Sequence, residues 1–427
     1  MLRVVRFFSE ARSFVWMFAV CIVAALLRLY VMAHLGPMLD ELKLIQEIID
    51  LRGPLVPVHF YGFGWGENTL LAFLAWPFMR FLHAGGLATI RGLVFTANMV
   101  SIILLYRVTL LFFHRRVALV TTVFSALWPW SILVGSVGFN VFILQPFVLG
   151  AILLLYRYVR TRRTMLLYGA AAMLAITAYG YELMLVWVPI LAILWYFCNR
   201  KHVRLSALVG PAFLGVVIAF PIALFHLQAH LNYYFVDHLF FFSYPHLRAT
   251  RYDGIAITGI YGGASLIGHY LFNYFAHFVF IFLAFSPLYY YASHDVFVAV
   301  LNSGAFFITD PLFYLLAPQN GLYFSSLSSL WDPFLILFAL YLLTIKKTVF
   351  QNRMFFFGWF LLYPLIPSFV NGDYVGYNLT RDIIGLPVLL MLSAFGAVSL
   401  LEKAQQEFKE YRERKAAQAL LAQVRRG

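Results

Sequence analysis

The stretch FVWMFAVCIVAALLRLYVMA, residues 14–33, is apolar at every position except Arg28. About 20 consecutive apolar residues are needed for an α-helix to cross the hydrocarbon layer of a bilayer. Similar uninterrupted runs recur along the chain as far as residues 383–401, and 63% of the 427 residues are apolar while only 11% are charged. This composition excludes an ordinary soluble enzyme and a disordered or fibrous chain. Because the apolar runs are continuous rather than alternating, a membrane β-barrel is excluded as well.

The sequence therefore predicts an all-α polytopic membrane protein with about 12 transmembrane helices, in a range of about 11–13. The predicted spans are residues 14–33, 88–112, 117–135, 139–157, 164–180, 183–198, 206–228, 269–290, 296–316, 331–345, 354–370 and 383–401. No small-residue cleavage site follows the first run, so we interpret it as a retained helix rather than a signal peptide. Cys21 and Cys198 lie inside apolar runs, and neither predicts a disulfide or a metal site.

The net charge of +13 is distributed according to membrane topology. Most of the 31 Lys and Arg fall in or beside alternate short gaps and in the tail, and by the positive-inside rule these segments face the cytoplasm. The two long polar loops, 34–87 and 229–268, are then non-cytoplasmic. We divide the chain into a transmembrane domain, 1–401, and a cytoplasmic charged helical tail, 402–427. This topology explains the basic charge; membrane lipids are predicted as partners, and nucleic acid is not.

The first long loop contains the most informative pattern. Residues 41–52, ELKLIQEIIDLR, have the spacing of an amphipathic helix lying in the membrane surface, and Gly53-Pro54 ends it. A turn-rich stretch follows, and then a short apolar segment, 68–82, which we interpret as a second surface helix. Asp40 and Glu41 stand where the first span gives way to the surface helix. They are candidates for catalysis, although capping of the helix by Asp40 and pairing of Glu41 with its dipole would also explain them.

This ordered set, which continues to Arg91 at the start of the next span, resembles the GT-C superfamily of polyprenyl-phosphate-sugar-dependent glycosyltransferases. It looks closest to the branch that holds protein O-mannosyltransferases and the lipid A aminoarabinose transferase. The resemblance is strongest over residues 14–200 and at the last span. It implies inverting transfer of a sugar from a polyprenyl-phosphate donor to a lipid, glycan or protein acceptor. The reaction would take place on the outer face of the membrane, and we expect a bacterial inner membrane.

The resemblance maps the family's catalytic aspartate, a general base, onto Asp40 and its acidic neighbour onto Glu41. It also maps an arginine that holds the donor phosphate onto Arg381, directly before the last span. Arg91 has the simpler alternative of anchoring a helix end. Asn140 stands about where the family often has a second acid, and a neutral amide is a poorer ligand for a divalent metal than a carboxylate. We therefore predict no metal and no cofactor.

Other candidate residues follow from the residue types themselves. Arg248 and Arg251, spaced i, i+3 among aromatic residues in the second long loop, are typical of a phosphate and sugar site, but also of an ordinary interfacial loop. Glu182 is isolated between two apolar runs, so it predicts a sugar contact, a partner for an arginine, or a carboxylate that reaches external water. The predicted substrate-binding residues are His59, Tyr61, Glu67, Asn140, Tyr181 and Glu182.

The main alternative function is a membrane transporter or lipid flippase without transferase activity, and a non-catalytic subunit of the same fold is a further one. Transporters usually place ionisable groups near the middle of their spans. Here the charges gather in the loops, with Arg28 as the exception, which favours the enzyme.

Overall fold

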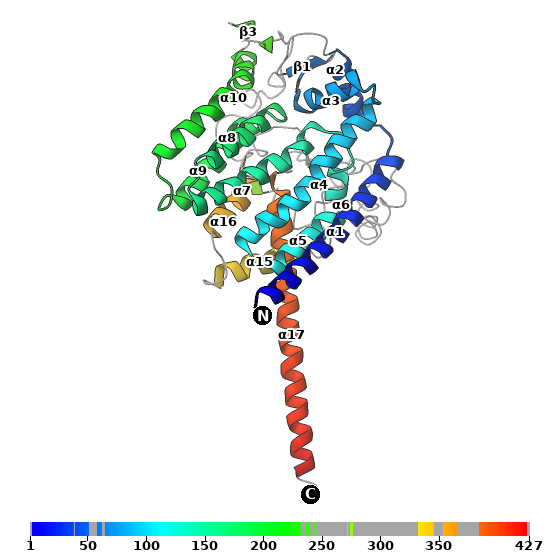
Figure 1. Cartoon of the computed structure of the whole chain (residues 1–427), viewed down its shortest axis with the longest axis vertical. Coiled ribbons are helices and arrows are strands. Elements are labelled where there is room, and N and C mark those ends of the chain that lie inside the picture. Colours follow the sequence, from blue (N-terminus) through cyan, green and yellow to red (C-terminus); the bar gives the residue numbers. More distant parts are fainter. Residues whose placement is uncertain are drawn as a thin grey trace.

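The computed structural model describes residues 2–37, 39–50, 58–61, 65–231, 236–239, 242–243, 271, 274–275, 332–345, 353–365 and 384–424. Figure 1 shows a bundle of helices from which one long helix projects. Within the described residues, five segments are long and apolar enough to cross a membrane: α1 (Leu2–His34), α4 (Gly86–Phe112), η1 with α7 (Asn140–Leu144, Gln145–Thr161), α10 (Ser206–Leu231) and α17 (Leu386–Val424). Shorter apolar helices are α3 (Leu70–Phe81), α8 (Met165–Ile176) with η2 (Thr177–Tyr179), α9 (Met184–Asn199), α15 (Asp332–Ile345) and α16 (Arg353–Leu362). The chain is an integral membrane protein.

The predicted spans that fall on described residues coincide with helices, but one of them is divided. The span predicted at 117–135 forms α5 (Arg115–Leu127) and α6 (Pro129–Val134). Trp128 between them is extended, with φ −65° and ψ 127°, because a residue that precedes proline is biased away from the helical region. The span predicted at 354–370 begins as α16, which ends at Leu362. The predicted spans 269–290 and 296–316 lie almost wholly outside the described residues, so the total of about 12 stays a prediction.

The first long loop contains the predicted surface helix, here α2 (Leu39–Asp50), and α3 in place of the segment predicted at 68–82. The turn-rich stretch between them forms an antiparallel hairpin, β1 (Val58–Tyr61) and β2 (Trp65–Asn68), in which His59 lies opposite Glu67 and Tyr61 opposite Trp65. A second hairpin, β3 (His238–Leu239) and β4 (Phe242–Ser243), forms in the other long loop. These short strands were not predicted.

Helix α4 organises the first half of the bundle, packing against α1, α2, α3, α5, η1 and α7. In the second half, α17 packs against α5, α15 and α16. Its contact with α15 is close enough that a Cβ at Gly396 would collide with the backbone carbonyl of Leu335. Large aromatic side chains fill the core, and Trp187, Trp195 and Trp359 are fully buried.

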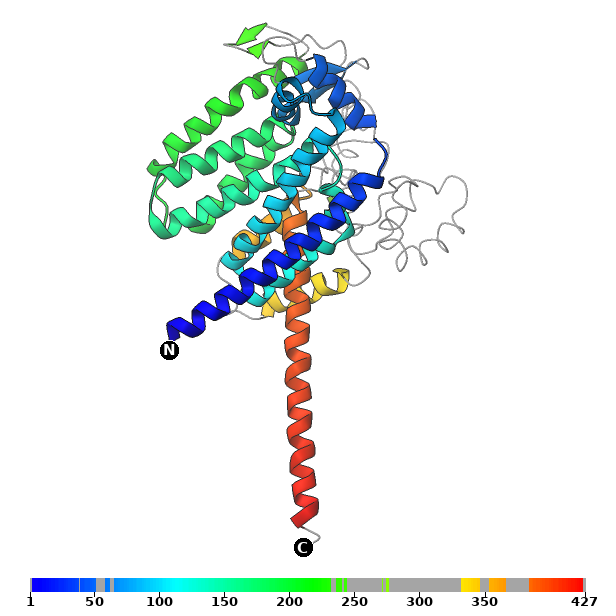
Figure 2. The ribbon, with the colours of Figure 1, turned by 45° about the vertical axis from the view of Figure 1, so that its right-hand side comes forward.

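The described parts of the two long loops lie at one end of the bundle. Figures 1 and 2 place α2, α3, the first hairpin and β3 at this end, which we call the hairpin end, and the N-terminus and the free end of α17 toward the opposite end. This agrees with the charge pattern, which assigns both loops to one side and both termini to the other. Which compartment the hairpin end faces stays a prediction.

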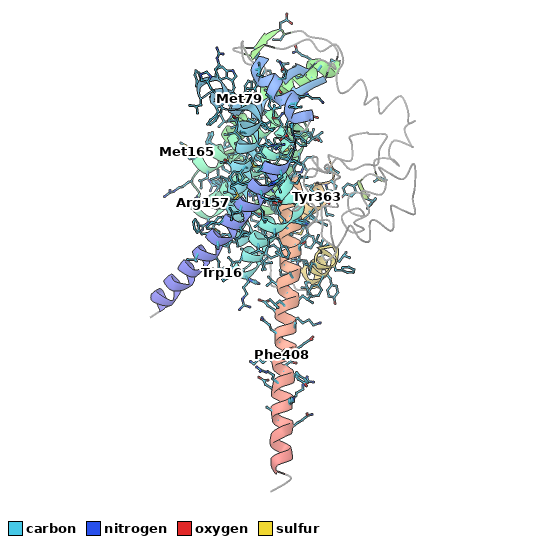
Figure 3. All side chains as sticks on the ribbon, turned by 90° about the vertical axis from the view of Figure 1, so that its right-hand side faces the viewer. Trp16, Met79, Arg157, Met165, Tyr363 and Phe408 are labelled. Atoms are coloured by element: carbon cyan, nitrogen blue, oxygen red, sulfur yellow. The ribbon has the colours of Figure 1, made fainter. Side chains whose placement is uncertain are left out.

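The charged tail is continuous with the last span. Helix α17 runs without a break through residue 401, where we had divided the chain, and its side chains are mostly exposed from there to Gln418. Ion pairs between residues four apart join Lys403 to Glu407, Lys409 to Glu413 and Arg414 to Glu410, at 3.9, 3.9 and 3.7 Å. Figure 3 shows Phe408 on this projecting part of the helix, away from the bundle.

The predicted orientation is testable by chemical labelling. In a background without Cys21 and Cys198, single cysteines at Gly64 and Ala249 are expected to react with a membrane-impermeant maleimide added to intact cells, because both loops are predicted to be non-cytoplasmic. A cysteine at Gln405, in the tail, is the matched control and should react only after permeabilisation. The reverse labelling pattern would place the hairpin end in the cytoplasm.

Candidate active site

A buried ion pair lies at the hairpin end, directly next to Asp40. Arg91 of α4 donates from Nε to Oε1 of Glu41 at 2.7 Å and from Nη2 to Oε2 at 2.6 Å. The exposed fractions of the two side chains are 3% and 0%. Glu41 Oε1 also accepts the backbone N–H of Gly138 at 2.7 Å. Both carboxylate oxygens of Glu41 are therefore engaged within the protein.

Arg91 also donates hydrogen bonds to backbone carbonyls at the end of the first span. Its Nη1 donates to the carbonyls of Met32 and Leu35 at 3.1 and 2.8 Å, and its Nη2 to the carbonyl of Gly36 at 2.7 Å. The last carbonyls of a helix have no partner within the helix, and a cation there also interacts favourably with the helix dipole. With two bonds to Glu41, all five N–H donors of the guanidinium are used. The alternative role of Arg91, anchoring a helix end, is the one that these contacts support.

A second buried arginine, Arg28, lies on α1, about two turns before the helix end that Arg91 contacts. Arg28 of α1 is 0% exposed. Its donors go to Asn98 Oδ1 and to the carbonyls of Ala24, Ser125, Ala126 and Ser131, with the Ser131 hydroxyl as a further acceptor, all at 2.7–3.1 Å. Arg28 thus joins α1 to α4 and to the break between α5 and α6.

The loop after α6 lies between these two arginines. A Cβ at Gly135 would stand 2.6 Å from Arg28 Nε and 2.7 Å from Asn98 Oδ1, and one at Gly138 would stand 2.7 Å from Ile90 Cγ1. Only glycine fits at either position without displacing its neighbours. The loop therefore spans the space from Arg28 to the Glu41–Arg91 pair.

Asn140 follows this loop and binds α3. Its Oδ1 accepts the backbone N–H of Leu71 at 3.1 Å. Thr69, the N-cap of α3, makes no side-chain capping bond, so Asn140 satisfies one of the N–H groups at the start of the helix from another part of the chain. A Cβ at Gly180 would collide with Leu144 of η1 and would lie 3.3 Å from Leu70 of α3. The turn that carries Tyr181 and Glu182 is thereby brought to the same place.

The structure thus gathers several of the predicted site residues around the start of α2 and α3. Asp40 and Glu41 lie in the first turn of α2, Asn140 binds α3, and the turn at 180–182 packs beside it. His59, Tyr61 and Glu67 lie on the first hairpin. Arg248, Arg251 and Arg381 lie outside the described residues.

Sequence reasoning missed how Arg28, Arg91 and the two loop glycines act together. The available signals were a single charge inside the first apolar run and the Gly135-Ser136-Val137-Gly138 sequence. Among the residues that the structure describes, no group of three or more His, Cys, Asp or Glu side chains is placed to hold a metal ion. The absence of a required metal remains a prediction.

Comparison with known proteins identifies the architecture. No protein-family model matches this sequence, and no curated protein matches it. The archaeal oligosaccharyltransferase AglB from Archaeoglobus fulgidus, in complex with an inhibitory peptide and a dolichol-phosphate, matches with a TM-score of 0.51 and 13% identity, over 93% of this chain and 52% of that one. This oligosaccharyltransferase belongs to the GT-C superfamily. The present chain has a GT-C fold.

Two further structures of the A. fulgidus enzyme agree. Its apo form matches with a TM-score of 0.50 and 14% identity, over 93% of this chain and 52% of that chain. The form tethered to an acceptor peptide containing the NVT sequon has the same TM-score and identity, over 91% and 50%. The present chain thus spans about half the length of the oligosaccharyltransferase chains that it matches. The more specific branch suggested by the sequence, with O-mannosyltransferases and the aminoarabinose transferase, stays a prediction.

Proposed function

We propose that this GT-C chain is an integral-membrane glycosyltransferase. It transfers a sugar from a polyprenyl-phosphate donor to a lipid, glycan or protein acceptor on the non-cytoplasmic face, in a bacterial inner membrane. The observation that carries the proposal is the position of Asp40. It is an acidic residue in the first turn of α2, at the hairpin end of a GT-C fold, next to a glutamate already engaged by Arg91.

The proposed reaction needs one base and one anion site. Asp40 takes the proton of the acceptor hydroxyl or amine as that atom attacks the anomeric carbon. The new bond forms on the face opposite the leaving group, so the configuration inverts. The bond from the anomeric carbon to the phosphate oxygen breaks, and its electron pair leaves with the polyprenyl phosphate. Arg381, together with Arg248 and Arg251, is proposed to stabilise the negative charge on that phosphate.

The contacts of Glu41 favour different roles for Asp40 and Glu41. A general base must reach the proton that it removes. Glu41 is 0% exposed, and its oxygens accept three hydrogen bonds from Arg91 and Gly138. We therefore propose that Glu41 holds the start of α2 in place, and that Asp40 is the base.

The kinds of substrate are proposed from the matched structures. One A. fulgidus structure holds a dolichol-phosphate and an inhibitory peptide, and another an acceptor peptide. These support a lipid-phosphate donor, and they include peptides among the acceptors to be tested. Comparing native lipids, free glycans and protein-linked sugars by mass spectrometry, with and without the protein, tests the proposal and names the acceptor. No change in any of these three classes would contradict it.

The contacts of Arg28 favour the enzyme over a transporter or flippase. An ionisable group inside a membrane span marks a substrate or ion path by default. The five donors of Arg28, however, are used by neutral acceptors of the protein itself. This charge is therefore explained without a transported substrate.

Arg381 is expected to bind the donor phosphate. A hydrogen bond to a charged group is worth roughly 1.5–3 kcal/mol, which corresponds to about 10–150-fold in affinity. Arg381→Ala should weaken donor binding by that factor, and Arg381→Lys should restore only part of it, because lysine cannot make two parallel bonds. Donor affinity is measured on purified, folded protein. If Arg381 only anchors the last span or pairs with Asp382, the alanine variant loses stability but binds donor normally.

A further inference from the structure

Arg28 is a buried cation for which the proposed reaction has no direct use. It lies within the part of α1 that is long and apolar enough to cross a membrane, and its exposed fraction is 0%. Among the residues that the structure describes, none of its acceptors is a carboxylate; they are one amide, one hydroxyl and four backbone carbonyls. Burying a charge without a counter-ion is costly. The charge of Arg28 is instead stabilised by the backbone carbonyls that surround it.

The acceptors of Arg28 include carbonyls that the helix break leaves without partners. The carbonyl of Ser125 would normally accept the N–H of residue 129, but that residue is a proline and has none. Arg28 Nη2 donates to this carbonyl at 2.9 Å, and Nη1 donates to the carbonyl of Ala126 at 3.1 Å. Both carbonyls belong to the C-terminal turn of α5, where a cation is favoured. Arg28 thus replaces the missing donor and holds the break in one geometry.

The same guanidinium controls where the following loop lies. Its Nε bonds to Asn98 at 2.7 Å, and Gly135 lies so close to both side chains that a Cβ there would collide with them. Three residues later, the N–H of Gly138 binds Glu41 at 2.7 Å. The chain of contacts therefore runs from Arg28 through the loop to the start of α2, where Asp40 lies.

We infer that Arg28 is a positioning residue for the candidate active site: by holding the α5–α6 break and the 135–138 loop, it fixes the start of α2. This inference rests on the proposed function. Arg28 itself touches no substrate. Removing it should therefore lower turnover, while donor binding, which is proposed to depend on other arginines, is retained.

The inference is tested with Arg28→Met and Arg28→Lys in the full-length protein. A misplacement of about 1 Å in a site can cost roughly 10²-fold in rate, so we expect kcat of Arg28→Met to fall by about that factor, with donor affinity unchanged. Lysine keeps the charge, but its three N–H donors lie on a single nitrogen. Arg28→Lys should therefore restore little of the lost kcat. Arg116→Met is the matched control. It removes an exposed arginine that pairs with Glu402 at 3.0 Å, and it should leave kcat unchanged.

Hydrogen exchange supplies a readout independent of activity. In Arg28→Met, the backbone N–H of Gly138 should exchange roughly tenfold faster, the equivalent of one net hydrogen bond, while α9 keeps its wild-type protection. If Arg28→Met fails to fold, Asn98→Ala, which removes one acceptor of Arg28, is expected to show the same local effect more weakly. Wild-type kcat and wild-type exchange at Gly138 in the folded variant would overturn the inference. If the wild-type protein transfers no sugar, the proposed function is contradicted. Hydrogen exchange at Gly138 would still test whether Arg28 positions the loop, because it does not depend on activity.

Discussion

Asp40→Asn is expected to lower the turnover number by about 10²–10⁴-fold, the usual contribution of a general base. Asparagine has nearly the size of aspartate and a similar helix propensity, so α2 should still form. The loss should appear in kcat, while donor affinity stays close to that of the wild type. Single-turnover transfer from a labelled donor, together with equilibrium binding of the donor, measures the two quantities separately.

The matched control for this experiment lies on the same helix. Asp50→Asn makes the same chemical change at the last residue of α2, away from the Glu41–Arg91 pair, and should leave turnover near that of the wild type. An active Asp40→Asn protein would remove Asp40 as the base. Equal losses in both variants would mean that the charge of α2, and not one carboxylate, is what the reaction needs.

Breaking the Glu41–Arg91 pair is expected to produce the largest loss of stability. Removing one member of a buried ion pair costs about 3–5 kcal/mol, because the other charge stays buried without its partner. Both Glu41→Leu and Arg91→Met should therefore lower the free energy of unfolding by an amount of that order. Unfolding in detergent micelles, followed by tryptophan fluorescence, measures the change.

The double variant separates the effect of breaking the ion pair from the effect of losing side-chain packing. In Glu41→Leu with Arg91→Met neither charge of this pair is left buried, and replacing a buried pair with apolar residues is often neutral or favourable. The double variant should thus be more stable than the sum of the two single losses predicts. The carbonyls of Met32, Leu35 and Gly36 still lose their donor, so recovery should be incomplete. Strictly additive losses would contradict the pairing.

The sequence predicted most of the helices that the structure describes, but not the places where they break or continue. Apolar runs such as 14–33 and 88–112 predict spans because length and hydropathy decide insertion. The break at Trp128-Pro129 was missed because the apolar run continues through it, although the proline was a local signal. The first hairpin was missed because its strands are only four residues long and the stretch around them is rich in glycine. The tail was predicted as a helix, but the sequence did not show that it continues the last span.

Only part of the candidate site could be predicted, because the sequence does not show which distant residues contact one another. The Asp40-Glu41 pair at the start of a surface helix could be found, but adjacent residues on a helix point about 100° apart, and the sequence cannot say which one points inward. The partner of Glu41 is 50 residues away along the chain. The partners of Arg28 are mostly backbone carbonyls, which every residue has, so no sequence pattern identifies them.

The most direct test of the central claim is transfer of radiolabelled sugar from a panel of polyprenyl-phosphate monosaccharides, using membranes that contain either the wild-type protein or Asp40→Asn at equal amounts. We predict that one of the donors transfers label to an endogenous acceptor in the wild-type membranes, and that the Asp40→Asn membranes do so at least about 100-fold more slowly. Equal labelling in the two kinds of membrane, or none from any donor with folded wild-type protein present, would contradict the account.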